Sequence, residues 1–480
     1  MWQPILMING FIVFILGAMM GIPALVNLYY GYEPDFLFIQ SSIIAIFFGG
    51  LLFLSNFGKV GKVSILQGYL ITVTCWLLLP FICSLPLIGN GDIKSFSDAL
   101  FEATSGITAT GATILSDIEA QPKSVLFWRS MLNGLGGIGI VIFAVALMPF
   151  LGIGGMNIFN KENSDTEDKF LPKLRDIAKD IIITYVILNL CCGFLLSWAG
   201  MDWFDATTFT MSTLGTGGLT PKNNSIAFFN SAKIETIVAI FMIIGALPIT
   251  YFILIFKIKS FSFVISNSQV NTFIKILIIY ISFFSVYMAY DNDIDLIRAF
   301  RIVGFNFISA ITTTGIISSD FTSWGTWSFI VFLLLYLHGG CTGSTTGSIK
   351  IFRWQVIGAF FKKNTIKSLS PNQVIVMKAG DKIINDNIVS SVFILVLGFI
   401  FAIILFTLIL CLYGIDFSTA LGAVSACITN SGVGLTAEIG PNGNFALFND
   451  SIKYILSFAM VLGRLEVISF ITILSKIKFK

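Results

Sequence analysis

Long uninterrupted stretches of apolar residues are the feature of this sequence that most limits what it can fold into. Three of the clearest cover residues 181–198, 393–412 and 454–474. About 20 predominantly apolar residues are enough for an α-helix to span a hydrocarbon core of roughly 30 Å. Charged residues make up only 11% of the chain, against about 25% in soluble domains. The sequence therefore predicts an all-α polytopic membrane protein, surrounded by membrane lipid and without a nucleic-acid partner.

Ten stretches are predicted as spanning helices. They cover residues 5–28, 36–56, 66–88, 124–151, 179–199, 231–256, 272–290, 326–352, 387–413 and 451–476. Most of the 29 lysines and arginines fall in alternate connections between these stretches, and connections rich in these residues stay in the cytoplasm. This bias places both termini in the cytoplasm and leaves a smaller basic set, which includes Arg129 and Lys222, in the outer connections.

The outer connections contain a repeated pattern. Each has a short apolar lead-in, too brief to span, then a run of threonine, serine and glycine, and then a spanning helix. The copies read FEATSGITATGAT (101–113), FTMSTLGTGGLT (209–220), FNFISAITTTGII (305–317) and SACITNSGVGLT (425–436). A period of about a hundred residues predicts four copies of one helix–pore loop–helix unit around one pore. We divide the chain into an N-terminal two-helix extension (1–58) and four pore repeats (59–165, 166–258, 259–365 and 366–480).

Four such loops around one axis predict an ion pore rather than ordinary outer loops. Non-helical backbone at membrane depth is tolerated where it is buried in protein or lines water. Glycine lets carbonyl oxygens turn inward, and a ring of these oxygens can replace the hydration shell of a potassium ion. The predicted filter, and K⁺ site, has one hydroxyl residue and one glycine per repeat: Thr110 and Gly111, Thr216 and Gly217, Thr314 and Gly315, and Ser431 and Gly432.

The eighth apolar stretch contains a run of small residues, LHGGCTGSTTGSIKIFR (337–353). Glycine at this density breaks a helix, so we expect an intramembrane loop between two half-helices, which could act as a gate below the filter. The gating residues would be Gly339, Gly340, Gly343, Ser344 and Gly347. The alternative is a close-packed helix interface. His338 is expected to be a packed residue, because no oxyanion hole or orienting carboxylate is visible that would make it catalytic with Ser344; the chain is not expected to be an enzyme.

Arg464 lies in the middle of the last apolar stretch, where a charge costs about 2.5–3.5 kcal/mol or more. One interpretation places its guanidinium in the ion path below the filter, as an electrostatic barrier that belongs to the gate. The other is an interhelical salt bridge, either with Glu102 or with Glu466 of another copy.

These motifs together resemble the Trk/Ktr/HKT superfamily of potassium transporters, and most closely its TrkH-type membrane subunits. The resemblance is carried by TSGITATGAT (104–113), LNGLGGIGIVIFAVALMPFLGIGGMNIF (132–159), TTTG (312–315), GGCTGSTTGSIK (339–350) and LGRLE (462–466). It implies a potassium-selective filter with one key glycine per repeat, a gating loop at 339–348 and a pore arginine at Arg464. Two departures are TNSGVG in the fourth repeat and Thr346, where relatives often have glycine.

The resemblance also implies partners. It predicts a homodimer in the bacterial inner membrane that rests on a cytosolic TrkA-like regulatory subunit, which binds NAD or ATP. The chain itself is expected to hold no cofactor, with K⁺ as its transported ion. The basic segment 353–386, together with 155–178, is either the docking face for that subunit or a solvated cytoplasmic face. Alternatives of the same fold are a sodium-permeable pore and a symporter that couples potassium to sodium or protons; a non-conducting scaffold is a further alternative.

Overall fold

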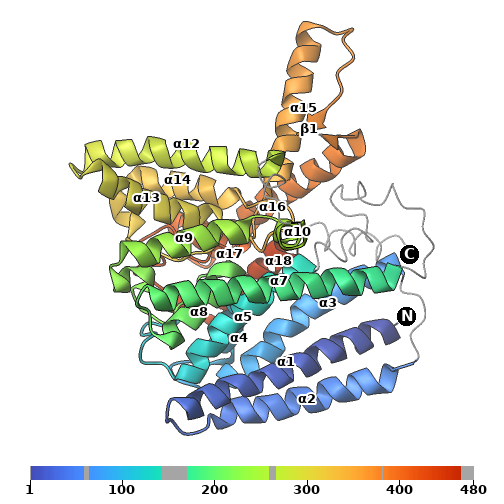
Figure 1. Cartoon of the computed structure of the whole chain (residues 1–480), viewed down its shortest axis with the longest axis vertical. Coiled ribbons are helices and arrows are strands. Elements are labelled where there is room, and N and C mark those ends of the chain that lie inside the picture. Colours follow the sequence, from blue (N-terminus) through green and yellow to red (C-terminus); the bar gives the residue numbers. More distant parts are fainter. Residues whose placement is uncertain (1, 59–63, 143–169, 259–265, 381, 466–480) are drawn as a thin grey trace.

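The computed structural model describes residues 2–58, 64–142, 170–258, 266–380 and 382–465, and helices dominate these ranges (Figure 1). Seven of the described helices are long and apolar enough to cross a membrane. They are α1 (Gln3–Tyr29), α2 (Phe36–Asn56), α3 (Ile65–Ser84), α5 (Lys123–Ile142), α7 (Phe170–Trp198), α12 (Ser268–Asp291) and α16 (Asp386–Leu412). The sequence prediction of a polytopic helical membrane protein is confirmed.

One predicted helix is bent sharply. Residues 231–256 form α9 (Ala232–Ala246) and α10 (Ile249–Ile258), whose axes meet at 96°. Pro248 has no amide hydrogen with which to continue the helix, and a proline favours extended backbone in the residue before it. Leu247 is indeed extended, with ψ of 156°. The stretch predicted as one spanning helix is therefore two helices joined at a sharp bend.

The eighth and tenth predicted helices are shorter than their apolar stretches. The eighth is broken as expected into α14 (Thr326–Leu337) and α15 (Ile351–Leu369). The tenth is described as α18 (Asp450–Arg464). The predicted ends at residues 151 and 476, and Glu466, lie outside the described residues.

Four short buried helices precede the Thr/Ser/Gly loops: α4 (Phe96–Ile107), α8 (Trp203–Gly215), α13 (Leu296–Ile311) and α17 (Phe417–Ile428). Each begins with a side chain that accepts hydrogen bonds from its first turn: Ser95, Asp202, Asp295 and Asp416. Such caps satisfy amides that have no partner within the helix, and an aspartate also balances the positive end of the helix dipole. We call these four the pore helices.

The remaining elements are small. Short 3₁₀ turns lie in the connections, at η1 (Leu85–Leu87), η5 (Ser225–Phe229), η6 (Phe321–Trp324) and η7 (Phe445–Leu447). Strands β1 (Lys378–Ala379) and β2 (Lys382–Ile383) pair antiparallel after α15. Helix α15 and the chain that follows it project from the body of the molecule (Figure 1).

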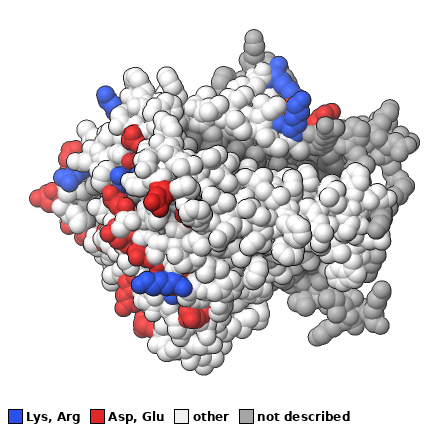
Figure 2. Space-filling view, turned by 90° about the horizontal axis from the view of Figure 1, so that it is seen from below, with Lys and Arg blue, Asp and Glu red and all other residues white. Residues whose placement is uncertain are grey.

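The surface has the charge distribution of a membrane protein. Acidic side chains gather at one end, shown at left in Figure 2, and a broad band without charged side chains follows. Large apolar side chains are exposed along helices that lie at the outside of the bundle, for example Phe47 of α2 and Phe401 of α16, at 62% and 65%. Such surface is stable against lipid but not against water.

Helices α1 and α2 approach each other closely at glycines. A Cβ atom at Gly49 would lie 2.5 Å from the amide nitrogen of Phe14 and 2.9 Å from the carbonyl oxygen of Gly10. The next residue, Gly50, meets nothing nearer than a ring atom of Phe14 at 3.5 Å. The two glycines therefore form a matched pair, one at a backbone contact and one beside it.

We expect Gly49→Ala to lower the thermal stability of the detergent-solubilised protein, because overpacking a contact costs about 1–3 kcal/mol. Gly50→Ala should leave stability unchanged or raise it, since alanine in a helix is favoured over glycine by roughly 0.5–1 kcal/mol. The midpoint of unfolding, followed by size-exclusion after heating, measures both. Equal midpoints for the two variants would contradict the close contact between α1 and α2.

Candidate functional site

The four loops that follow the pore helices share one backbone conformation. In each, a non-glycine residue has φ between 50° and 56°, and a glycine with φ between 71° and 91° follows two residues later. Side chains disfavour this left-handed region, whereas glycine adopts it freely. The pairs are Ala109 and Gly111, Thr216 and Gly218, Thr313 and Gly315, and Asn430 and Gly432.

The second loop corrects the predicted register by one residue. In every loop the residue before the left-handed glycine donates its amide hydrogen to the carbonyl five residues earlier, at 2.8–3.0 Å. These donors are Thr110, Gly217, Thr314 and Ser431. Gly217 is therefore the counterpart of Thr110, and Gly218 that of Gly111. The prediction that pairs Thr216 and Gly217 with Thr110 and Gly111 is wrong, because adjacent glycines leave either register open in the sequence.

The left-handed glycines and the carbonyls before them close into a ring. A Cβ atom on any of these glycines would lie less than 3.0 Å from a carbonyl oxygen of another loop. The order is Gly111 against Gly217, Gly218 against Thr314, Gly315 against Ser431, and Gly432 against Thr110. Each loop thus contacts the next and the fourth contacts the first, so the loops surround one axis. We call Gly111, Gly218, Gly315 and Gly432 the glycine ring.

Hydroxyl pairs support three of the four loops. The Oγ1 atoms of Thr108 and Thr110 lie 2.7 Å apart, and those of Thr312 and Thr314 lie 2.8 Å apart. In the fourth loop the Thr429 and Ser431 hydroxyls are 2.9 Å apart. The second loop has glycine at both corresponding positions, 215 and 217. The ring is therefore closed in its backbone but unequal in its side chains.

The glycine ring forms one end of a cavity of about 250 Å³, whose lining also includes Thr113, Lys222 and Asn223. At its rim the Asn223 amide donates to Asp117 Oδ1 at 3.0 Å. This hydrogen bond lowers the pKa of the Asp117 carboxyl, so the rim keeps its negative charge in mild acid. Within the described ranges no three His, Cys, Asp or Glu side chains gather to hold a metal ion; the ligands that the ring offers are backbone oxygens.

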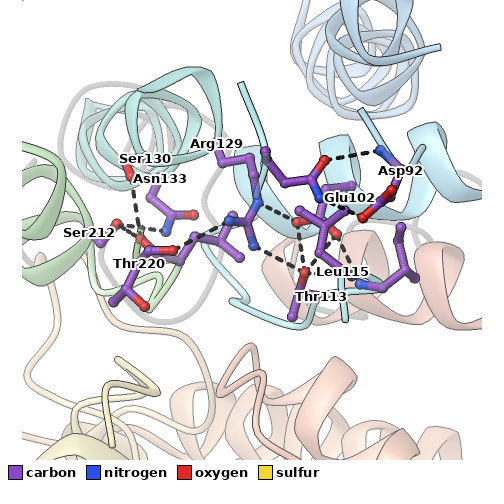
Figure 3. Close-up of polar contacts among 12 residues, drawn as sticks. Asp92, Glu102, Thr113, Leu115, Arg129, Ser130, Asn133, Ser212 and Thr220 are labelled. Atoms are coloured by element: carbon purple, nitrogen blue, oxygen red, sulfur yellow. Dashed lines mark hydrogen bonds and ion pairs between the residues drawn. The ribbon is translucent and has the colours of Figure 1, made fainter. Parts of the chain in front are cut away.

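A buried ion pair links the first two loops (Figure 3). Glu102 of α4 and Arg129 of α5 are 0% and 1% exposed, with Arg129 Nε 2.5 Å from Glu102 Oε1. Arg129 also donates to Thr113 Oγ1 at 3.0 Å and to the Thr220 carbonyl at 3.4 Å. Glu102 accepts the amide hydrogen of Ile114 at 3.1 Å. Arg129 therefore lies inside α5, within the predicted span 124–151, and is buried against the loops rather than exposed in an outer connection.

A non-helical segment of residues 338–350, which we call the interhelical loop, joins α14 to α15 and confirms the predicted break. Its backbone pairs with the bend between α9 and α10. The Cys341 amide donates to the Ala246 carbonyl at 2.9 Å, and the Thr345 amide donates to the Gly245 carbonyl at 3.2 Å. The alternative of a continuous small-residue helix is excluded.

The predicted gating residues lie at different places in this loop. Gly339 donates to the Ile349 carbonyl at 2.9 Å, and Gly340 donates to Thr346 Oγ1 at 3.0 Å. The Gly343 carbonyl accepts from the Ile249 amide at 3.2 Å. The Ser344 hydroxyl donates to the Cys341 carbonyl at 2.6 Å.

Gly347 brings the interhelical loop to the pore helices. Its amide donates to Thr313 Oγ1 at 2.8 Å, and a Cβ atom here would lie 2.5 Å from the Thr429 carbonyl oxygen. Thr313 and Thr429 lie within two residues of the ends of the third and fourth pore helices. The loop therefore lies against the C-terminal ends of those helices, in the neighbourhood of the glycine ring.

Arg464 is 3% exposed, and its partners among the described residues are backbone carbonyls rather than a carboxylate. Its Nη1 donates to the Thr345 carbonyl at 3.0 Å and its Nη2 to the Gly136 carbonyl at 3.2 Å. The suggested salt bridge with Glu102 is wrong, because Glu102 is bonded to Arg129. The guanidinium instead connects the interhelical loop with α5.

His338 is packed, as expected. Its ring stacks on Trp354 with centroids 4.8 Å apart, and its Nδ1 lies 2.8 Å from the Leu334 carbonyl oxygen. Ser344 uses its hydroxyl within the interhelical loop, on the Cys341 carbonyl and beside Thr346.

A family model described as TrkH, cation transport protein, matches residues 35–479. The chain belongs to the TrkH family. It is 32% identical to the Trk system potassium uptake protein TrkG of Escherichia coli, over 97% of this chain and 96% of the relative. It is also 32% identical to TrkI of Halomonas elongata, over 99% and 96%. The crystal structure of the potassium transporter TrkH from Vibrio parahaemolyticus superposes with a TM-score of 0.90 at 27% identity, covering 99% of this chain and 98% of that one.

These matches agree with the sequence prediction of the family and of a transporter rather than an enzyme. They cover each relative almost from end to end, so the likeness extends over the whole architecture and is not limited to a single repeat. The division into repeats at 58, 165, 258 and 365 stays a prediction.

We expect Glu102→Gln to lower thermal stability strongly. The change leaves the buried Arg129 without its counter-charge, and breaking a buried pair from one side costs about 3–5 kcal/mol. Asp180→Asn provides the control, because it breaks the pair with Lys257, whose side chain is 60% exposed, and exposed pairs contribute about 0–1 kcal/mol. A midpoint for Glu102→Gln as high as that of Asp180→Asn would contradict a stabilising role for the Glu102–Arg129 pair.

Proposed function

We propose that this TrkH-family chain takes up potassium through the centre of the glycine ring. The observation that carries the proposal is the closed cycle of backbone contacts, in which each ring glycine leaves room for a carbonyl of the neighbouring loop. Carbonyl oxygens of Thr110, Gly217, Thr314 and Ser431 would then take the place of the water around a K⁺ ion. The names of the full-length relatives as potassium uptake proteins support the same cargo.

The electrostatics of the pore helices favour a cation. A helix carries roughly half a negative charge at its C-terminus, and the four pore helices all end immediately before the loops of the ring. Aspartate caps hold the opposite ends of three of them. Four partial negative charges thus point toward the axis of the ring.

The gate in this proposal is the interhelical loop together with Arg464. The loop abuts the ends of two pore helices through Gly347, and the Arg464 guanidinium binds the loop at the Thr345 carbonyl. A buried positive charge beside the path would repel an approaching K⁺, so it would slow passage without choosing between K⁺ and Na⁺.

The partners follow from the family and from the projecting arm formed by α15 and the hairpin β1–β2. The arm stands away from the helical body (Figure 1) and carries Lys362, Lys363 and Lys367. We propose that the chain forms a homodimer in the bacterial inner membrane, with both termini in the cytoplasm. The arm would then meet a TrkA-like cytosolic subunit, and any NAD or ATP would bind to that subunit.

The test of the function is ion flux into liposomes that contain this chain alone, comparing K⁺ or Rb⁺ with Na⁺ and Li⁺. We expect K⁺ and Rb⁺ to enter well ahead of Na⁺ and independently of imposed Na⁺ or proton gradients. Equal K⁺ and Na⁺ flux would contradict the selective pore, and flux that needs a second gradient would favour a coupled symporter. If the chain alone gives no flux, the TrkA-like subunit and ATP are added. No flux under these conditions contradicts the proposal.

Gly218→Ser and Gly315→Ser should each abolish the preference for K⁺, because a Cβ atom at either position meets a neighbouring carbonyl of the ring. Gly21→Ser in α1 is the matched control, since the nearest atom to a Cβ atom there is the Ser42 hydroxyl at 4.0 Å. The ratio of K⁺ to Na⁺ flux reports the effect independently of the amount of protein reconstituted. If Gly218→Ser keeps the parental ratio, Gly218 is not the filter glycine of the second loop, and the original prediction of Gly217 is favoured.

Arg464→Ala should raise K⁺ flux severalfold, because it removes the positive charge of the proposed gate. The K⁺ to Na⁺ ratio should stay unchanged, because the glycine ring is left intact. Arg464→Lys is the control that keeps a positive charge in the same helix. If the alanine variant conducts no faster than the lysine variant, Arg464 is not a barrier to the ion.

A further inference from the structure

The second loop of the ring has no side chain where the other three have a supporting hydroxyl. Thr110, Thr314 and Ser431 each bond to a hydroxyl two residues earlier. Their counterpart is Gly217, and two residues before it stands Gly215. Yet the Gly217 amide bond to the Ser212 carbonyl, at 2.9 Å, matches the corresponding bonds of the other loops. Because neither Gly215 nor Gly217 has a side chain, a residue elsewhere must fix the position of this loop.

The empty space at Gly217 is filled by Asn133 of α5, which belongs to another repeat. All three atoms at the end of the Asn133 side chain lie within 3.0 Å of where a Cβ atom of Gly217 would be. Asn133 can come this close because α5 and α8 touch at glycines: a Cβ atom on Gly137 would lie 2.6 Å from the Gly215 Cα. Asn133 is 0% exposed.

Asn133 also reaches the backbone just beyond the ring. Its Nδ2 donates to the Ser212 hydroxyl at 3.2 Å, and the Ser212 hydroxyl donates to the Leu219 carbonyl, which follows Gly218 directly. One turn earlier on α5, Ser130 donates to the same Leu219 carbonyl at 3.4 Å, and Arg129 donates to that of Thr220 (Figure 3). The side-chain amide of Asn133 thus packs against Gly217 and, through the Ser212 hydroxyl, is linked to the backbone at Leu219 just beyond the ring.

We infer that Asn133 is a positioning residue for ion selectivity: it supplies, from the first repeat, the side chain that Gly217 of the second repeat lacks. The inference rests on the proposed filter function. Asn133 does not contact the ion; it sets where the Gly217 carbonyl and Gly218 lie. Its Oδ1 has no hydrogen-bond partner among the described residues, so the side chain is held there by fit rather than by a saturated network.

A two-residue cycle tests this complementarity. Asn133→Ala should lower the K⁺ to Na⁺ flux ratio by about fivefold or more, the factor expected from losing one buried hydrogen bond. Gly217→Ser should lower it as well, because the new side chain collides with Asn133. The double variant Asn133→Ala with Gly217→Ser should recover to within about twofold of the parent, since the serine enters the vacated space and restores the hydroxyl of the other loops.

Asn189→Ala is the control, because this asparagine of α7 also lies in a spanning helix, is half-buried rather than fully buried, and donates to the Tyr185 carbonyl of its own helix at 2.8 Å. It should keep the parental ratio. An Asn133→Ala variant with the parental ratio, or a double variant whose loss is the product of the single losses, overturns the inference while leaving the filter intact. A parent that does not prefer K⁺ overturns the proposed function, and the inference with it. Because the alanine variant only removes atoms, it decides the question even where the double variant fails to fold.

Discussion

The contact between a glycine and the carbonyl oxygen of the neighbouring loop is the constraint on which the rest of this structure depends. A backbone at membrane depth that is neither helix nor strand must find partners within the protein. Here four loops do so by approaching one another so closely that none of Gly111, Gly218, Gly315 and Gly432 can carry a side chain. The pore helices, their caps and the spanning helices around them all serve to keep that approach the same on every side.

The four loops reach the same backbone conformation by different means. Hydroxyl pairs support the first, third and fourth, whereas the second relies on α5, which presents Arg129 and Asn133 on one face four residues apart. The first loop adds the buried Glu102–Arg129 pair. In the third loop the neutral Asn306 occupies the place of Glu102 and bonds to Ser318 and Ser319. Fourfold geometry therefore does not require fourfold chemistry, and substitutions at corresponding positions need not be equivalent.

Hydropathy, the spacing of the loops and the density of glycine around Gly343 were enough to predict the helical architecture, the repeat and the broken helix. Three other features were not predicted. The first is the bend between α9 and α10, because the apolar stretch continues across Pro248. The proline itself indicates a break in the helix. Either Gly217 or Gly218 could be aligned with Gly111 in the sequence. The backbone hydrogen bond from the Gly217 amide to the Ser212 carbonyl decides for Gly218. Arg129 and Asn133 acquire their roles from Glu102 and Gly217, which are distant in the sequence and become neighbours only on folding.

The bend between α9 and α10 has a mechanical consequence for the interhelical loop. Breaking the helix at Pro248 frees the carbonyls of Gly245 and Ala246, and these are the groups that accept the loop amides of Thr345 and Cys341. Were the loop to withdraw alone, it would strand unpaired amides and carbonyls where no lipid can receive them, each at a cost of about 1–3 kcal/mol. The low-energy displacement is one in which loop and bend travel together as a single rigid body. The bend and the interhelical loop are thus one hydrogen-bonded unit, so a displacement of either carries the other with it.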